Sequence, residues 1–181
     1  WRLLKNLREN FATAFVLLGK QRFERLLAYP YFTDHPPEHW ALIRLGPHLS
    51  QWCQEKYRGP HQQFIQDSTL VEYFLNSGFV AGHNDPIRAS EADLNELSSR
   101  PLYLQPHFKL FSFPYDLMRF REVLLEAEED HWLTHPLPET DRSRSFYYIT
   151  FRNNEGSMIW RYISEAMAFL LGLFEKGCSI D

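Results

Sequence analysis

Hydrophobic residues in the first hundred positions recur every three or four residues, the spacing of one helical face. One such face runs from residue 4 to 18 and should end at Gly19. A second helix should end at Pro30, because proline cannot continue a helix interior. A later helix should begin at Ser68, whose hydroxyl can cap a first turn. Residues 1–100 are therefore predicted to form a helical bundle.

After Pro101 the hydrophobic pattern changes to a period of two, which is typical of a strand. Leucine or phenylalanine at 102, 104, 108 and 110 predicts one apolar face. Pro106 interrupts this run, and proline cannot donate a ladder hydrogen bond, so we expect a free edge or a bulge there. A helix over 115–129 and an acidic, proline-rich loop should follow.

The strongest local pattern is a β-hairpin. Aromatic and β-branched residues fill 146–151 and 158–163, and Asn153-Asn154-Glu155-Gly156 between them supplies turn chemistry. Ser164 should then cap a last helix that ends at Gly177. The residues expected to point inward from that helix are Met167, Leu170, Leu171 and Phe174.

Together these patterns predict an α+β protein. An N-terminal helical bundle lobe, residues 1–100, should precede an α+β lobe, residues 101–181. The second lobe should hold a small three-stranded antiparallel sheet with packed helices, and its hairpin should span 145–163.

Composition narrows the classes of partner. The chain has 181 residues and a formal charge of −4, whereas proteins that grip nucleic acids through phosphates usually carry a basic excess. Cys53 and Cys178 are far apart, which argues against a disulfide framework and favours a reducing cytoplasm. No apolar run reaches the length of a membrane span. We therefore expect a cytoplasmic protein that binds neither nucleic acid nor membrane.

Candidate chemistry is sparse. His35 with His39, and His131 with His135, have the i, i+4 spacing of paired metal ligands, but prolines interrupt or end both segments. We expect these histidines to lie at the surface or to form hydrogen bonds, and we predict no metal site. The sequence contains no nucleophile elbow and no phosphate-binding glycine loop. These patterns predict no catalytic residue and no enzyme activity of the chain alone.

The hairpin is a better candidate for a functional site, because both of its faces are apolar or aromatic. A small sheet usually has one covered face and one wet face. Surplus apolar surface near a free strand edge suits β-augmentation, in which an extended peptide adds a strand to the sheet. Alternatively, the helical lobe or a subunit interface covers the second face. The pattern alone leaves both interpretations open.

Three segments carry a resemblance to a known family: PPEHWALIRLGPHLSQWCQEK (36–56), LYLQPHFKLFSFPYDL (102–117) and FYYITFRNNEGSMIWRYISEAMAFLLGLFEKGCSID (146–181). In this order they resemble the partner proteins of multinuclear non-haem iron oxidases, which modify ribosomally made peptides. The methanobactin-biosynthesis branch is the most similar. The resemblance covers most of residues 30–181.

The resemblance implies a division of labour. The iron and the TIM barrel belong to the oxidase subunit, and this chain would hold no cofactor of its own. Its helical lobe would dock on the barrel, and its C-terminal sheet, similar to a truncated winged helix, would bind the leader of the precursor peptide. The complex would convert core cysteines to oxazolone and thioamide groups, as in the biosynthesis of a copper chelator.

The resemblance also suggests contact residues. Leader contacts are expected from Phe108, Lys109, Phe146, Tyr148, Thr150, Met158, Trp160 and Arg161. Trp40 and Trp52 are candidates for the oxidase interface. For the tryptophans and for Phe146, a purely structural role in the core is the alternative.

Two other functions remain as alternatives. A winged-helix-like C-terminus is also compatible with a DNA-binding transcription regulator, whose affinity would fall steeply with salt. An enzyme with histidine-bound metal is the second alternative, and stoichiometric iron or zinc in the purified chain would favour it.

Overall fold

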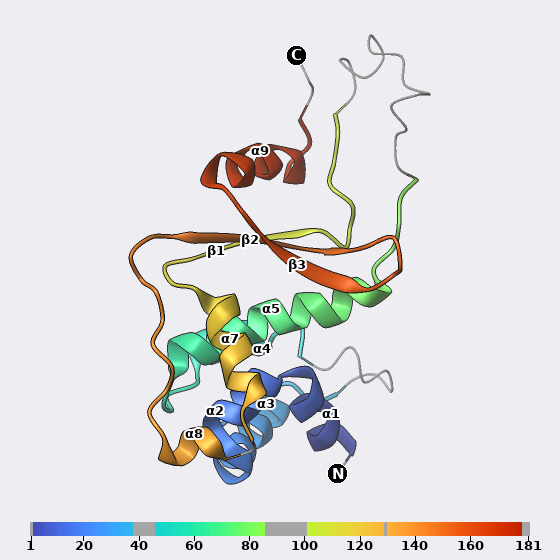
Figure 1. Cartoon of the computed structure of the whole chain (residues 1–181). Coiled ribbons are helices and arrows are strands. Elements are labelled where there is room, and N and C mark those ends of the chain that lie inside the picture. The colour runs from blue at the N-terminus through green and yellow to red at the C-terminus, as the bar shows by residue number, and fades with distance from the viewer. Residues whose placement is uncertain (1, 38–45, 86–100, 129, 179–181) are drawn as a thin grey trace. The chain divides into compact units, whose positions relative to one another are not determined.

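The computed structural model describes residues 2–37, 46–85, 101–128 and 130–178. They form helices and a three-stranded antiparallel sheet, which confirms the predicted α+β class (Figure 1). The chain divides into two compact units, residues 1–77 with 113–145, and residues 78–112 with 146–181. This division differs from the expected boundary at residue 100, because residues 113–145 pack with the N-terminal helices.

The first unit is helical. Its elements are α1 (Arg2–Asn10), α2 (Ala12–Arg22), the π-helix η1 (Phe23–Ala28), α3 (Tyr29–Asp34), α4 (Leu49–Glu55), most of α5 (Gln62–Val80), α7 (Leu117–Glu126) and α8 (His131–Thr134). Apolar side chains from α1, α2, η1, α4, α5 and α7 share one buried cluster.

The backbone leaves the helical conformation at Gly19, as predicted: φ there is +65° and ψ is 164°, and an added Cβ would lie 2.6 Å from a methyl carbon of Leu133. Two other predicted helix boundaries are wrong. Pro30 lies in the first turn of α3, where a missing N–H costs nothing. Ser68 lies inside α5, because its hydroxyl donates to the carbonyl of Phe64 (2.6 Å) rather than capping a first turn.

A buried carboxylate connects three helices of this unit. Glu72 Oε1 in α5 accepts hydrogen bonds from the backbone N–H (3.1 Å) and hydroxyl (2.8 Å) of Thr13 in α2. Arg121 in α7 donates to the same oxygen at 3.2 Å. Because a buried charge without partners is strongly destabilising, this network fixes α2, α5 and α7 together.

The second unit contains the sheet. Its strands β1 (Lys109–Phe113), β2 (Phe146–Arg152) and β3 (Met158–Ile163) have the order β1-β2-β3, and α9 (Glu165–Glu175) follows. β2 and β3 pair antiparallel, with Thr150 opposite Trp160. β2 is therefore the central strand, and β1 and β3 are the outer strands of the described sheet.

The hairpin and the cap of the last helix are confirmed. The Asn153 side chain accepts hydrogen bonds from the backbone N–H groups of Glu155 (3.0 Å) and Ser157 (2.9 Å). Gly156 completes the turn with φ of +83°. The Ser164 hydroxyl accepts from the N–H of Met167 at 3.2 Å.

The predicted first strand is wrong in its start and its phase. β1 begins at Lys109, because Pro106 lies in a turn that the N–H of Phe108 closes on the carbonyl of Gln105 (2.9 Å). Within β1 the buried side chains are Phe111 and Phe113, not Leu110.

None of the helices in the described part of the chain combines the length and the hydropathy that a membrane span needs.

Candidate functional site

The two faces of the central strand differ in exposure. Phe146, Tyr148 and Thr150 are 4%, 1% and 1% exposed, whereas Tyr147, Ile149 and Phe151 are half-buried. The first face belongs to the interior of the protein. A bound peptide could therefore contact only the second face or an outer strand.

The structure does not bring the predicted peptide contacts together at one surface. Phe146, Tyr148 and Thr150 lie on β2, whose backbone pairs on both sides and whose side chains on this face are buried. They offer no surface to a peptide. The rings of Phe146 and Tyr148 belong to the core, and Tyr148 also contacts the half-buried Trp160 (6.1 Å between ring centroids).

The remaining predicted contacts divide between the two outer strands. Met158, Trp160 and Arg161 lie on β3. Lys109 begins β1 and pairs with Glu175 (3.2 Å), and Phe108, just before the strand, stacks on Phe151 (5.9 Å between centroids).

Of the two expected interface tryptophans, Trp40 lies outside the described residues. Trp52 is buried, and its indole N–H donates to Asp34 Oδ2 at 2.6 Å. Its ring also meets Tyr31 edge-on. These contacts favour the structural role that the sequence left as the alternative for Trp52.

The exposure of α9 corrects another expectation. Met167 and Leu170, expected inside, are 44% and 47% exposed, and Phe169 is 72% exposed. The sequence of this helix, EAMAFLLGLFE, is mostly apolar, although the helix has no fully buried residue. Apolar surface gathered in this way is typical of an interaction site.

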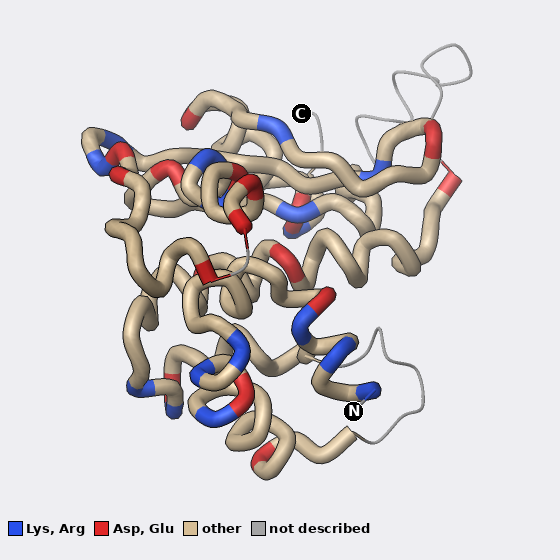
Figure 2. The backbone as a smooth tube through the Cα atoms, turned by 60° about the horizontal axis from the view of Figure 1, so that its bottom comes forward, with Lys and Arg blue, Asp and Glu red and all other residues tan. Residues whose placement is uncertain are grey.

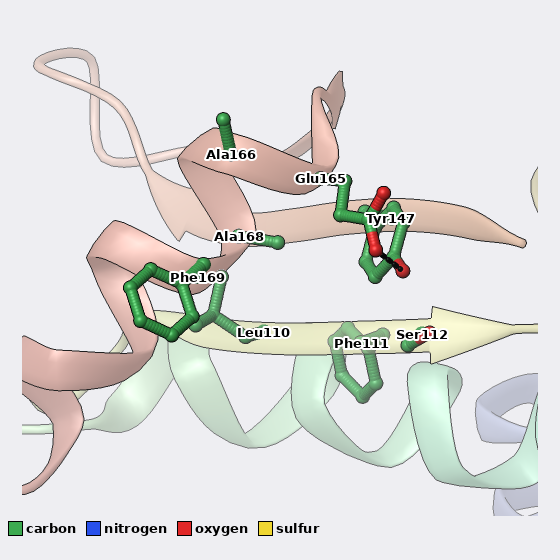
Figure 3. A pocket seen from close by; sticks show the side chains of 8 residues that line it. All are labelled: Leu110, Phe111, Ser112, Tyr147, Glu165, Ala166, Ala168 and Phe169. Atoms are coloured by element: carbon green, nitrogen blue, oxygen red, sulfur yellow. Dashed lines mark hydrogen bonds between the residues drawn. The ribbon is translucent and has the colours of Figure 1, made fainter.

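A pocket of about 650 Å³ lies between α9 and the sheet (Figure 3). The lining residues are Leu110, Phe111, Ser112, Tyr147, Glu165, Ala166, Ala168 and Phe169. Figure 3 shows Leu110 and Phe169 on one side of the view and Tyr147 with Glu165 on the other. The volume falls within the usual range for ligand sites.

The pocket lies beside β1, an outer strand of the sheet. At one end Lys109, the first residue of β1, pairs with Glu175, the last of α9. At the other end Ser112, near the end of β1, lines the pocket with Glu165, the first residue of α9. The helix and the strand therefore run beside each other in opposite directions. A peptide on the outer edge of β1 would have α9 as its neighbour.

One polar contact marks the pocket. The Tyr147 hydroxyl donates to Glu165 Oε1 at 3.2 Å (Figure 3). The sequence interpretation assigned no function to Tyr147, Glu165 or Phe169. The signal that could have revealed them is the lack of a polar face in residues 165–175, because such a helix needs cover on more than one side.

No histidine or cysteine is among the described residues that line this pocket. No group of three or more histidine, cysteine, aspartate or glutamate side chains in the described ranges could hold a metal ion. His131 and His135 stack with ring centroids 4.1 Å apart. Burial raises the pKa of the Cys53 thiol to about 12, which keeps it neutral and weakly nucleophilic.

Charges along the described backbone are mixed, with lysine and arginine interspersed among acidic residues (Figure 2).

No protein-family model and no curated protein matches this chain. The function is therefore inferred from the residues and their geometry.

Proposed function

We propose that this chain is a non-catalytic partner subunit that binds the leader of a ribosomally made precursor peptide. It would present the cysteines of that peptide to a TIM-barrel, iron-dependent oxidase, which converts them to oxazolone and thioamide groups. The resemblance of residues 36–56, 102–117 and 146–181 to such partner proteins supplies the identity of the peptide and of the oxidase. We place the complex in the cytoplasm, which suits a chain with two cysteines, Cys53 and Cys178, that lie far apart in the sequence.

The observation that carries the proposal is the outer strand β1 with an open apolar pocket beside it. An outer strand presents alternate N–H and C=O groups away from its sheet, and an extended peptide can pair with them. The pocket would receive a side chain of that peptide, which supplies sequence preference. β1 is favoured over β3 because the pocket is lined by β1, β2 and α9.

A separate binding subunit has a physical advantage. A leader held on one subunit converts the encounter between core peptide and oxidase into an intramolecular step, which raises the effective concentration of the core to about millimolar with a short linker. The subunit then increases turnover without contributing a reacting group.

The test fills the pocket. Ala168→Trp places an indole where Ala168 lines the pocket, so leader affinity should fall at least about tenfold by loss of the side-chain site. The chain is co-expressed with a TIM-barrel iron oxidase and a candidate short precursor peptide. Co-purification and the mass of the peptide are then measured.

Ala127→Trp is the matched control, because Ala127 is also half-buried but lies after α7, outside the residues that line the pocket. It should leave peptide conversion unchanged. Equal conversion of the precursor without this chain would refute the proposal. Salt-sensitive binding of duplex DNA in place of the peptide would favour a transcription regulator.

A further inference from the structure

The lining of the pocket combines apolar walls with one charge. Of the described residues that line it, Glu165 is the one acidic side chain, and none is basic. The others supply aliphatic carbon, a serine hydroxyl and aromatic rings. Among the described residues, no lysine or arginine pairs with Glu165. The site thus carries a negative charge beside an apolar cavity.

The Glu165 carboxylate is held in place at this position. Its Oε1 accepts the Tyr147 hydroxyl at 3.2 Å, and it lies in the first turn of α9, where the helix dipole favours an anion. Aromatic rings complete the site, since Tyr147 and the 72% exposed Phe169 both line it. Ring faces attract cations.

We propose that this pocket binds the side chain of a lysine or arginine in the added strand. The methylene stem would lie along Leu110, Ala168 and Phe169, and the cationic head would reach Glu165 and the Tyr147 ring. Long basic side chains bury their stems in this way while their heads keep polar partners. This inference rests on the proposed function, because it assumes that a peptide occupies the edge of β1.

A purely apolar guest fits this lining less well. An apolar side chain would displace water from the Glu165 carboxylate and offer it no hydrogen bond in return. The cost of this desolvation opposes binding. A basic guest compensates for it with a charge-assisted hydrogen bond. If Glu165 served only the N-terminus of α9, its replacement would change stability and leave peptide preference as it was.

Peptide selection tests this directly. A display library of random 12-residue peptides is selected on the immobilised full chain, on Glu165→Gln and on Glu165→Lys. The wild type should enrich lysine or arginine at one position. Glu165→Gln, which can still accept the Tyr147 hydrogen bond, should lose that enrichment, and Glu165→Lys should shift it to aspartate or glutamate. Glu155→Gln, on the exposed hairpin turn, is the matched control and should select as the wild type does.

A binding titration makes the test quantitative. The best wild-type peptide is resynthesised with norleucine in place of the selected basic residue, which keeps the stem and removes the charge. Its affinity for the wild type should fall about fivefold to tenfold, and its affinity for Glu165→Gln should hardly change, as expected for a partly covered ion pair. Equal affinity of the two peptides for the wild type, or equal basic enrichment on Glu165→Gln, would refute the basic guest.

The same selection separates failure of this inference from failure of the proposed function. Peptides that are enriched on the wild type but not on Ala168→Trp, without any basic preference, would retain the peptide site and reject the basic guest. If no peptide is enriched, or if enriched peptides bind Ala168→Trp equally well, the peptide site itself is wrong.

Discussion

Thr150 is a small polar residue on the buried face of the central strand. Its hydroxyl has no hydrogen-bond partner among the described residues, and the side chain is 1% exposed. Thr150→Val replaces the hydroxyl with a methyl group of similar shape. Because an unsatisfied buried hydroxyl costs about 1–3 kcal/mol, the variant should raise the free energy of unfolding by about 1 kcal/mol.

Urea denaturation measures this change, and Thr140→Val, a half-buried threonine outside the sheet, is the comparison. Binding of a selected peptide by Thr150→Val should match the wild type, because Thr150 faces the interior. A large loss of peptide affinity with intact folding would instead show that Thr150 contacts the peptide.

The side chain of His107, two residues before β1, accepts a hydrogen bond from the backbone at the end of β2. Its Nδ1 accepts the backbone N–H of Arg152, the last residue of β2, at 3.0 Å, so the ring must be neutral at that nitrogen. Burial, followed by the charge of Arg152 and the stacked ring of His83, lowers the pKa of His107 below its usual value near 6.5. The folded state therefore favours the neutral ring.

The sign of the pH effect follows from the lowered pKa. The stability that His107 contributes is present above pH 6.5, the unfolded value, and is lost as the pH falls through the lower folded value. His107→Asn keeps an acceptor for Arg152 but does not titrate. Between pH 7.5 and 5, unfolding curves should show a larger loss of stability for the wild type than for His107→Asn.

The comparison isolates His107 because His61, whose pKa burial also lowers, titrates in both proteins. His48→Asn, at an exposed histidine, should behave as the wild type does. Identical pH dependence of the wild type and His107→Asn would show that this hydrogen bond does not govern acid stability.

At the scale of elements, two glycines of the second unit test the hairpin and the last helix in opposite directions. Gly156 has φ of +83° in the hairpin turn, and Gly172 lies inside α9; an added Cβ would meet nothing within 4 Å at either position. Gly156→Ala should cost about 1 kcal/mol through backbone strain. Gly172→Ala should stabilise by about 0.5–1 kcal/mol through helix propensity.

Thermal and urea unfolding of both variants check this prediction. Since space is open at both sites, steric clashes do not contribute, and the pair separates backbone conformation from packing. Equal effects of the two substitutions would contradict the conformations assigned to the turn and to α9.

Local chemistry explains which elements the sequence predicts. The prediction of the hairpin is confirmed because Asn153 and Gly156 themselves supply the turn geometry. The prediction of the α9 cap is confirmed because the Ser164 hydroxyl forms a hydrogen bond within its own helix. The predicted alternation of buried and exposed residues in β1 is wrong. The turn around Pro106 displaces the start of the strand, and Phe111 rather than Leu110 is buried. That outcome depends on tertiary packing, which period-two alternation does not encode.

The candidate site was only partly predictable for the same reason. The hairpin and its strand edge follow from sequence, but the exposed face does not, since both faces read as apolar. Which face α9 contacts decides that Tyr147 lines the pocket and Tyr148 belongs to the core. Glu165 reads as an ordinary first-turn carboxylate until the fold places it beside β1.

For the whole molecule, the structure separates residues that hold the fold from residues available to a partner. Phe169 is 72% exposed, so most of its ring is already hydrated in the isolated chain. Phe169→Ser should therefore change the free energy of unfolding by less than about 1 kcal/mol, because little buried apolar area is lost. Its affinity for the selected peptide should fall about tenfold, since the bound strand would cover that ring.

Phe146→Ala provides the contrast, because Phe146 is 4% exposed. This truncation of a buried ring should cost about 3–5 kcal/mol. Tryptophan fluorescence in urea measures stability, and calorimetric titration with the selected peptide measures affinity. If Phe169→Ser were as destabilising as Phe146→Ala, the outer side of α9 would be core. If it left both stability and affinity unchanged, the peptide would bind elsewhere. Lost affinity with retained stability would establish α9 and β1 as a binding surface that folding leaves open.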